Sequence, residues 1–238
     1  EGDIANLWTY LDWMMSASSN AAASMVMKQI LLLQQFGERY PVSESEANAF
    51  YHDTSRTKLG QILAEAMERG VIGSGLNPGK LRQGKFFTPE GKRRVPGLRS
   101  YASTRELMRL LLHLEQGRVV DAFSSREIKR LMYITQKRIR YASHPALNDA
   151  AVYFKSGSLY GCRRQPGVKC EKYKGTSINL LNSVAIVESP AGAEQQLFYL
   201  VVVNSNVLKE NSSVAHQTLA LRLHRLIEKR DRARRTKD

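Results

Sequence analysis

The spacing of hydrophobic residues changes once along the chain, and this change limits the folds that are open to it. In the first part, apolar side chains recur three or four positions apart, as at Leu107, Leu111 and Leu114. Later they alternate with polar side chains or form short runs rich in β-branched residues. A period of 3.6 indicates helices and a period of 2 indicates strands. Helices followed by strands predict an α+β fold with an antiparallel sheet, rather than a doubly wound α/β sheet.

The same patterns give the boundaries of the expected elements. Helices are predicted at residues 4–15, 20–36, 43–52, 55–69, 103–116, 124–138 and 214–229, and strands at 151–155, 178–188 and 197–204. Residues 3–150 are therefore expected to be mostly helical, and residues 151–229 to form the strands and a closing helix.

The balance of charge points to anionic partners. Lysine and arginine number 36 against 22 acidic residues, which gives a formal net charge of +14. Such a surface favours nucleic acid, anionic lipid or another acidic polymer. The basic residues are spread along the chain, with clusters at 92–94, 137–140 and 229–237. Because no zinc-finger spacing or RNA-binding aromatic motif accompanies them, nucleic acid is not the favoured partner.

No segment is predicted to span a membrane. The longest apolar stretches, near 25–33 and 197–203, are much shorter than the roughly 20 residues that a transmembrane helix needs. The chain opens with Glu1, without a charged region followed by an apolar one. We interpret it as a mature or truncated form, with any export signal upstream.

Two cysteines leave two alternatives open. Cys162 and Cys170 lie in a polar stretch, without the C-x-x-C spacing or the second ligand pair of a zinc site. In an oxidising compartment they can close a short loop as a disulfide, and in a reducing one they stay as free thiols. We expect neither a metal nor a cofactor.

Two short motifs stand out for their chemistry. Ser18-Ser19-Asn20 lies between two predicted helices, and Lys155-Ser156-Gly157 lies at the end of the first predicted strand. Each has a structural alternative. Ser18 and Asn20 can terminate and cap helices, and Lys155 can protect an edge strand from aggregation. Their order and their contexts together favour a shared catalytic site.

In these motifs the chain resembles the penicillin-binding and class A β-lactamase superfamily, whose signatures are S-x-x-K, S-x-N and K-[ST]-G. The resemblance covers most of residues 3–36 and 98–228, whereas residues 41–97 depart from it as an atypical insertion. It implies one incomplete catalytic domain over residues 1–238. That domain would have a helical subdomain packed with an antiparallel sheet, which a C-terminal helix covers.

The resemblance also implies roles for single residues. Ser18 would relay a proton during acyl transfer, and Lys155, converging on it, would lower the cost of that transfer. Asn20 would hydrogen-bond the peptide-like side chain of a substrate.

On the strand, Ser156 would hydrogen-bond a terminal carboxylate of the substrate. Gly157 would let the substrate lie close to the backbone. Ser158 would contribute its backbone N–H to an oxyanion hole.

The nucleophile of the family has no counterpart in its expected place. None of the residues before Ser18 forms S-x-x-K. One such motif follows later, from Ser55 to Lys58, where it needs a circular permutation to be catalytic or is simply the cap of a helix. The resemblance therefore implies that the nucleophile belongs to a missing N-terminal part and that this chain alone is inactive. Glu90 is the nearest acid to the family's deacylating glutamate, but its surroundings do not match.

The function implied is that of a serine hydrolase which transfers an acyl group from a peptide-like amide or a β-lactam through a serine acyl-enzyme. Cell-wall peptidoglycan is a candidate substrate, and the bacterial periplasm or another exported location is expected. Without a deacylating base, a peptidase, transpeptidase or esterase is favoured over a fast β-lactamase. The alternative is a non-catalytic module of the same fold that binds an anionic polymer through its basic surface.

Overall fold

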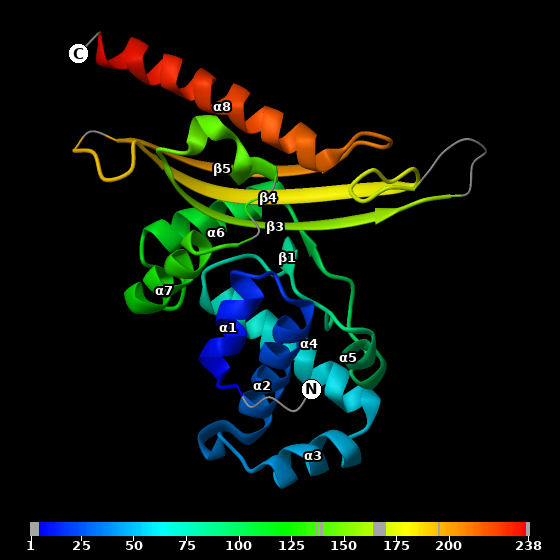
Figure 1. Cartoon of the computed structure of the whole chain (residues 1–238). Coiled ribbons are helices and arrows are strands. Elements are labelled where there is room, and N and C mark those ends of the chain that lie inside the picture. The colour runs from blue at the N-terminus through cyan, green and yellow to red at the C-terminus, as the bar shows by residue number, and fades with distance from the viewer. Residues whose placement is uncertain (1–4, 137, 139, 164–169, 195, 237–238) are drawn as a thin grey trace. The chain divides into compact units, whose positions relative to one another are not determined.

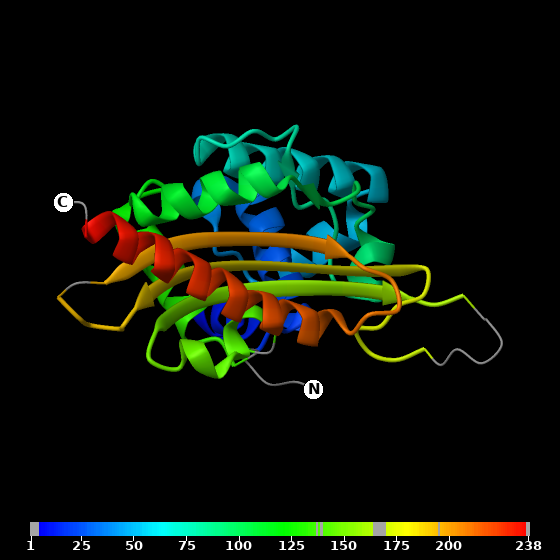
Figure 2. The ribbon, with the colours of Figure 1, turned by 90° about the horizontal axis from the view of Figure 1, so that it is seen from above.

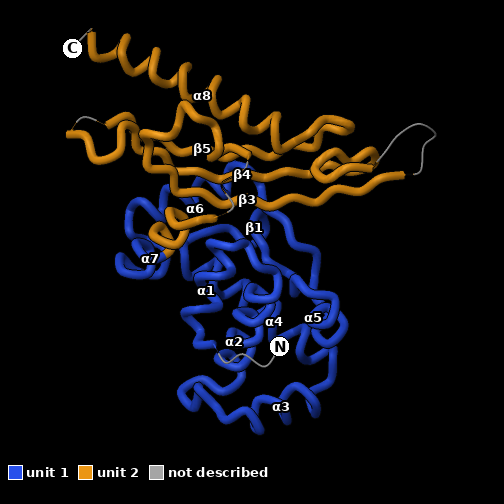
Figure 3. The backbone as a smooth tube through the Cα atoms, in the orientation of Figure 1, with its two compact units in different colours: residues 1–127 blue, residues 128–238 orange. Residues whose placement is uncertain are grey.

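The computed structural model describes residues 5–136, 138, 140–163, 170–194 and 196–236. The described chain divides into two compact units, residues 1–127 and residues 128–238 (Figure 3).

Unit 1 is helical (Figure 1). Its elements are α1 (Leu7–Met15), α2 (Asn20–Phe36), the 3-10 turn η1 (Gly37–Arg39), α3 (Glu44–Asp53), α4 (Arg56–Gly73), β1 (Leu81–Arg82), α5 (Pro89–Arg94), β2 (Tyr101–Ala102), α6 (Thr104–Glu115) and the first half of α7 (Ala122–Tyr133). The polar residue before a helix often supplies its cap. Before α3, for instance, Ser43 and Glu46 form a complete capping box.

The core of unit 1 lies between α2 and α4. Their apolar stripes meet there with two side chains from the following loop and α5 region, and the buried set is Met27, Leu31, Leu59, Ile62, Leu63, Phe86 and Val95. Burial of apolar side chains of this size contributes about 1.5–3 kcal/mol each. The stripes therefore account for the helices even though residues 41–97 carry few regular motifs.

Two buried polar side chains fix the irregular segments of unit 1. Ser24 of α2 accepts hydrogen bonds from the backbone N–H groups of Phe87 and Thr88, at 3.1 and 3.0 Å. Glu106, which is 1% exposed at the start of α6, accepts a 2.7 Å hydrogen bond from the backbone N–H of Asn77. Buried polar groups need such partners, so these two residues position loops that have no regular structure.

Unit 2 is a sheet covered by a helix (Figure 2). After the end of α7 come the 3-10 turns η2 (Arg140–Ser143) and η3 (Pro145–Leu147), then β3 (Ala151–Gly161), β4 (Ile178–Ser189), β5 (Leu197–Asn206) and α8 (Ser212–Arg235). The strands are antiparallel in the order β3-β4-β5, so β3 is an edge strand. Alternate side chains of the three strands face α8. Together with side chains of η2, η3 and α8 they form the core of unit 2, whose buried members are Tyr141, Ala142, Leu147, Val152, Phe154, Ala185, Val187, Tyr199, Val201 and Ala220.

The α+β class, the antiparallel sheet and the closing helix are confirmed, and most of the differences concern where elements end. Strand β3 continues to Gly161, whereas the sequence predicts an end at Lys155. Its second half consists of small and polar residues, yet it pairs fully with β4. Helix α7 ends at Tyr133 rather than at 138.

Other differences are smaller. Helix α8 runs on to Arg235, beyond the predicted end at 229. Between the helices predicted at 55–69 and 103–116, where the sequence predicts no element, the chain forms α5 and the two-residue pairing of β1 with β2. The predicted first helix begins at residue 4, which lies outside the described residues. In the described part of the chain, no helix combines the length and the apolar composition that crossing a membrane requires.

Candidate active site

The Ser18-Ser19-Asn20 motif forms the turn between α1 and α2 in unit 1. Ser19 is the N-cap of α2, and its hydroxyl accepts a 3.2 Å hydrogen bond from the N–H of Ala22. Asn20 is the first helical residue and is exposed. Ser18 is also exposed and has a φ of 55°, in the left-handed region that non-glycine residues rarely occupy. The turn therefore holds Ser18 in a costly conformation next to an ordinary helix cap.

The Lys155-Ser156-Gly157 motif lies in the middle of edge strand β3 in unit 2. Ser156 pairs with Ser183 of β4, and Ser158 pairs with Leu181. Because side chains alternate along a strand, Ser156 and Ser158 share the face of buried Phe154, towards α8. Lys155 and Gly157 belong to the opposite face. Apart from Gly157 itself and its two chain neighbours, no described residue has an atom within 4 Å of the point where a Cβ would stand on Gly157.

Arg140 of η2 joins the two serines. One of its terminal nitrogens donates to the hydroxyl of Ser156, and the other donates to the hydroxyl of Ser158 at 3.1 Å. Its guanidinium lies 4.9 Å from the ring centre of Tyr173. Arg140 is only 7% exposed, and its Nε has no hydrogen-bond partner among the described residues. A buried guanidinium with unused hydrogen-bonding capacity is suited to an anion.

Two cations lie close together at this site. The Lys155 ammonium donates a 3.1 Å hydrogen bond to the backbone oxygen of Ser156. Burial, followed by the positive charge of Arg140, lowers the pKa of Lys155 to about 8. Burial also lowers the pKa of Arg140 itself. The lysine can therefore release a proton close to neutral pH, and both charges favour a negatively charged ligand.

A buried histidine continues this polar region beneath α8. His216 is 3% exposed, and its two ring nitrogens contact the hydroxyls of Ser183 at 3.2 Å and Ser205 at 2.8 Å. Burial and then the charge of Arg140 lower its pKa. His216 thus links β4 and β5 to α8, and its neutral form is favoured next to Arg140.

The sequence motif includes Lys155 and Ser156, whose catalytic and binding roles stay predictions, and it gives no sign of Arg140 or His216. In the sequence Arg140 is only one member of a basic cluster at 137–140, and Lys137 of that cluster lies outside the described residues. A basic residue shortly before an edge strand was the one signal available. Ser18 lies in unit 1 and Lys155 in unit 2, so their convergence stays a prediction. The roles of Asn20, Gly157 and Ser158 also stay predictions.

Two further positions were considered from the sequence. Ser55 is the N-cap of α4 and accepts a 3.2 Å hydrogen bond from the N–H of Lys58, as the capping interpretation predicts. Glu90 is exposed in the first turn of α5 and lines a cavity of about 370 Å³ with Lys28 and Arg94.

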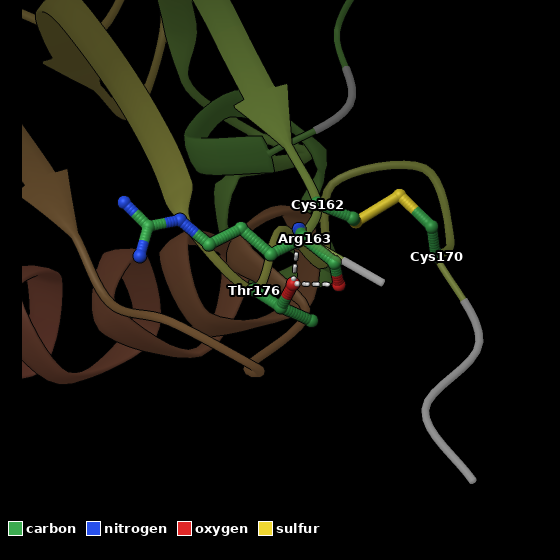
Figure 4. The surroundings of a disulfide bond; sticks show 4 residues. All are labelled: Cys162, Arg163, Cys170 and Thr176. Carbon is green, nitrogen blue, oxygen red and sulfur yellow. Dashed lines mark hydrogen bonds between the residues drawn. A yellow bond between two sulfur atoms is a disulfide. The ribbon is translucent and has the colours of Figure 1, made fainter. Parts of the chain in front are cut away.

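The two cysteines form a disulfide next to the end of β3 (Figure 4). The Cα atoms of Cys162 and Cys170 are 5.9 Å apart. Beside them, the hydroxyl of Thr176 accepts a 3.1 Å hydrogen bond from the N–H of Arg163. Elsewhere in the described chain, no group of three or more His, Cys, Asp or Glu side chains is arranged to hold a metal ion.

Three solved structures share this fold. PBP-A has a TM-score of 0.52 and 14% identity, covering 94% of this chain and 62% of its own. A beta-lactamase from Chitinophaga pinensis DSM 2588 has a TM-score of 0.53 and 16% identity, covering 92% and 63%. A representative of class A beta-lactamase from Bacteroides cellulosilyticus DSM 14838 has a TM-score of 0.51 and 15% identity, covering 89% and 59%. At such identities the likeness shows the fold alone.

The chain spans less than two thirds of the length of each of these neighbours. No curated protein matches it in sequence. A family model does match, over residues 2–220, and its description is "Beta-lactamase enzyme family". Since the match takes in both motifs and nearly the whole chain, the protein belongs to the beta-lactamase enzyme family.

Proposed function

We propose that this chain carries the substrate-binding part of a serine hydrolase of the β-lactamase and D-Ala-D-Ala peptidase type. The reaction is acyl transfer from a peptide-like amide or a β-lactam through a serine acyl-enzyme. The nucleophilic serine lies outside these 238 residues, so the chain alone is inactive. Family membership supports hydrolase chemistry in general, and the finer assignment rests on the site.

The arrangement of Arg140 with Ser156 and Ser158 carries this proposal. A guanidinium and two hydroxyls on an edge strand match a carboxylate, which accepts several hydrogen bonds in one plane. Lys155 adds a second positive charge to the same strand. A hydrophobic core does not require these polar groups, and burying two neighbouring cations in it is unfavourable. The cluster is therefore better explained by an anionic end of a substrate, such as a terminal peptide carboxylate or that of a penicillin.

The remaining residues follow from the same assignment. Lys155, with a pKa of about 8, is suited to exchange a proton with Ser18, which would relay it to the leaving amine. The open space beside Gly157 lets an extended substrate lie along β3. The backbone N–H of Ser158 would supply one half of an oxyanion hole, and the nucleophile the other half. Asn20 would hold the amide of the substrate.

Slow deacylation is part of the proposal. Glu90 shares its cavity with the side chains of Lys28 and Arg94, and Ser18 does not line that cavity. We do not assign it as the base that activates water. A long-lived acyl-enzyme therefore favours a peptidase, transpeptidase or esterase over rapid β-lactam hydrolysis.

Export to the periplasm or the cell exterior is proposed as well, because disulfides persist in oxidising compartments. Titration of thiols under denaturing conditions tests this. Protein isolated from the periplasm should show no free thiol, and two titratable thiols would contradict the proposal.

Acylation tests the proposed function. Protein that includes the sequence upstream of Glu1 is incubated with a fluorescent penicillin, and the adduct is measured by mass spectrometry. We expect a covalent adduct with the longer protein and none with the 238 residues alone. Arg140→Gln should slow acylation about ten- to a hundredfold, the effect of losing a hydrogen bond to a charged group.

The control experiment uses a ligand without a carboxylate. A penicillin methyl ester has no carboxylate, so Arg140→Gln should leave its acylation rate unchanged. An equal loss with both ligands would show that Arg140 supports the fold rather than the carboxylate. Absence of any adduct in the longer protein, at high concentration and long times, would overturn the proposed function.

A further inference from the structure

One aromatic side chain of unit 2 lies over the buried guanidinium of Arg140. The guanidinium carbon is 4.9 Å from the ring centre of Tyr173, and the ring of Tyr160 meets that of Tyr173 edge-on, with 6.3 Å between the centres. Guanidinium groups pack favourably on aromatic faces. Burial lowers the pKa of Arg140, whereas Tyr173 raises it through charge and hydrogen bonding. Tyr173 therefore stabilises the charged form of an arginine that burial disfavours.

The backbone holds both members of this pair at a conformational cost. Arg140 has a φ of 81° and Tyr173 a φ of 64°, which residues with a side chain rarely adopt. The carbonyl oxygen of Tyr173 accepts hydrogen bonds from the backbone N–H and the hydroxyl of Ser212, at 3.0 and 3.1 Å. The start of α8 thus fixes the backbone of Tyr173 independently of Arg140. Two strained residues that meet in this way are candidates for a functional role.

Arg140 needs such a restraint because no acidic group orients it. Among the described residues, its guanidinium contacts the hydroxyls of Ser156 and Ser158 and the ring of Tyr173, and none of these carries a carboxylate. Hydroxyl hydrogens rotate to suit their partners, so two hydroxyls alone restrain the guanidinium weakly. A side chain that is already held in place loses less freedom when its ligand binds.

A purely structural role is the alternative for Tyr173. The residue is half-buried, and it is not among the side chains that form the core of unit 2. Its described ring contacts are Tyr160, Arg140 and the ammonium of the exposed Lys172 at 5.1 Å. A ring that contacts two cations and one other tyrosine contributes little to apolar packing. The contacts therefore favour a role towards Arg140.

We propose that Tyr173 is a positioning residue, whose ring holds the Arg140 guanidinium ready for the carboxylate of a substrate. The inference rests on the proposed function for the nature of the ligand. Because Tyr173 acts through Arg140, its loss should weaken the binding of substrates that have a carboxylate. The acylation step that follows binding should not change.

Acylation kinetics of the longer protein with benzylpenicillin separate these two steps. Tyr173→Leu keeps an apolar side chain without an aromatic face, and it should raise the apparent dissociation constant about tenfold, as expected for a partly buried cation–π pair. The limiting rate of acylation should stay as in the wild type. Tyr173→Phe keeps the ring and should restore binding. With the methyl ester of the penicillin, both variants should behave like the wild type.

Two controls separate positioning from a general loss of structure. In an Arg140→Gln background, Tyr173→Leu should have no further effect, because both residues act through one interaction. Tyr101→Leu removes the same kind of pair in unit 1, where Arg82 lies 4.6 Å from the ring centre of Tyr101, and should leave binding unchanged. Additive losses in the double variant, equal losses with acid and ester, or a Tyr173→Leu variant that binds like the wild type would overturn the inference. The proposed function would still stand.

A second measurement needs neither acylation nor a substitution at Tyr173. The guanidinium N–H signals of Arg140 are followed by NMR in the longer protein, while acetyl-D-alanyl-D-alanine or its C-terminal amide is added. We expect slow guanidinium rotation before any addition, and a shift of the signals with the acid only. This result in a protein that forms no penicillin adduct would support the inference and contradict the proposed function. Free rotation before addition, or equal shifts with acid and amide, would overturn the inference.

Discussion

The two motifs of this chain lie in unlike surroundings. Around Ser18-Ser19-Asn20 the described hydrogen bonds belong to helix ends, with Ser19 capping α2. Around Lys155-Ser156-Gly157 a buried arginine from a separate segment reaches the strand and binds two of its hydroxyls. The first motif is built by local backbone geometry, and the second by tertiary structure.

This difference indicates where the chain tolerates groups that lower the stability of the fold. In unit 2, burial lowers the pKa values of both Lys155 and Arg140, which means that folding opposes their charged forms. Perturbed groups of this kind gather at functional sites. In the motif of unit 1 the cost is conformational and falls on Ser18, at a φ of 55°. Each motif thus contains a residue that the local structure does not require.

The largest difference in the free energy of unfolding is expected between substitutions of two neighbouring residues of β3. Phe154 is fully buried, and Phe154→Ala should lower the free energy of unfolding by about 3–5 kcal/mol. Lys155→Ala should change it by less than about 1 kcal/mol, because the lost contacts are offset by relief of a buried charge. Urea unfolding at pH 7 measures both. If Lys155→Ala costs as much as Phe154→Ala, Lys155 supports the fold and its functional assignment fails.

The pH dependence of stability should reveal the charge on Lys155. Its pKa is about 8 in the folded protein and 10.5 as the ordinary value. Between these values the unfolded chain binds more protons, so stability should rise with pH from 8 to 10.5. Lys155→Gln should remove this rise, and Lys58→Gln, at an exposed position, should not. Arg140→Gln should shift the start of the rise to higher pH, because it removes a neighbouring positive charge. A wild type and a Lys155→Gln variant with parallel curves would contradict the assignment.

Much of the fold was predictable because its elements have strong local signals. The stripe of Leu107, Leu111 and Leu114 gave α6, and the β-branched run of β5 gave that strand. The second half of β3 was missed because serine, glycine and tyrosine there carry no clear alternation, and pairing with β4 decides its structure. The pairing of β1 with β2 joins residues about 20 positions apart and has no pattern of its own.

For the site, the strand motif was recognisable but its partners were not. Arg140 contacts Ser156 from another segment, with a φ of 81° that no local pattern indicates for an arginine. His216 lies on α8, and the pairing of β4 with β5 brings Ser183 and Ser205 to its two ring nitrogens. Contacts between distant segments are decided by packing, so a single sequence cannot supply them.

A smaller effect should separate the two serines of the first motif. Ser19→Ala removes the N-cap of α2 and should lower the free energy of unfolding by about 1 kcal/mol. Ser55→Ala, at the N-cap of α4, should have an effect of the same size. Ser19→Asp should retain most of the stability, because aspartate is an equally good cap. Thermal unfolding followed by circular dichroism measures all three, and a Ser19→Ala variant as stable as wild type would show that the cap bond contributes little.

The smallest expected change in the free energy of unfolding concerns Ser18. Whether the substitution stabilises or destabilises the protein distinguishes the two interpretations of this residue. Glycine adopts positive φ without the penalty of a side chain, so Ser18→Gly should raise the free energy of unfolding by about 0.5 kcal/mol. Val120→Gly is the matched control, because Val120 has a φ of 65° in the same unit and is 75% exposed. Both variants should be more stable in urea unfolding.

Only Ser18→Gly, however, should abolish penicillin acylation when introduced into the longer protein, because it alone removes a hydroxyl that the proposed reaction needs. A residue that costs stability and is required for activity is the trade-off expected at an active site. If Val120→Gly stabilises the protein and Ser18→Gly destabilises it, the Ser18 hydroxyl holds the turn together. The strained turn would then be a structural feature rather than part of the proposed proton relay.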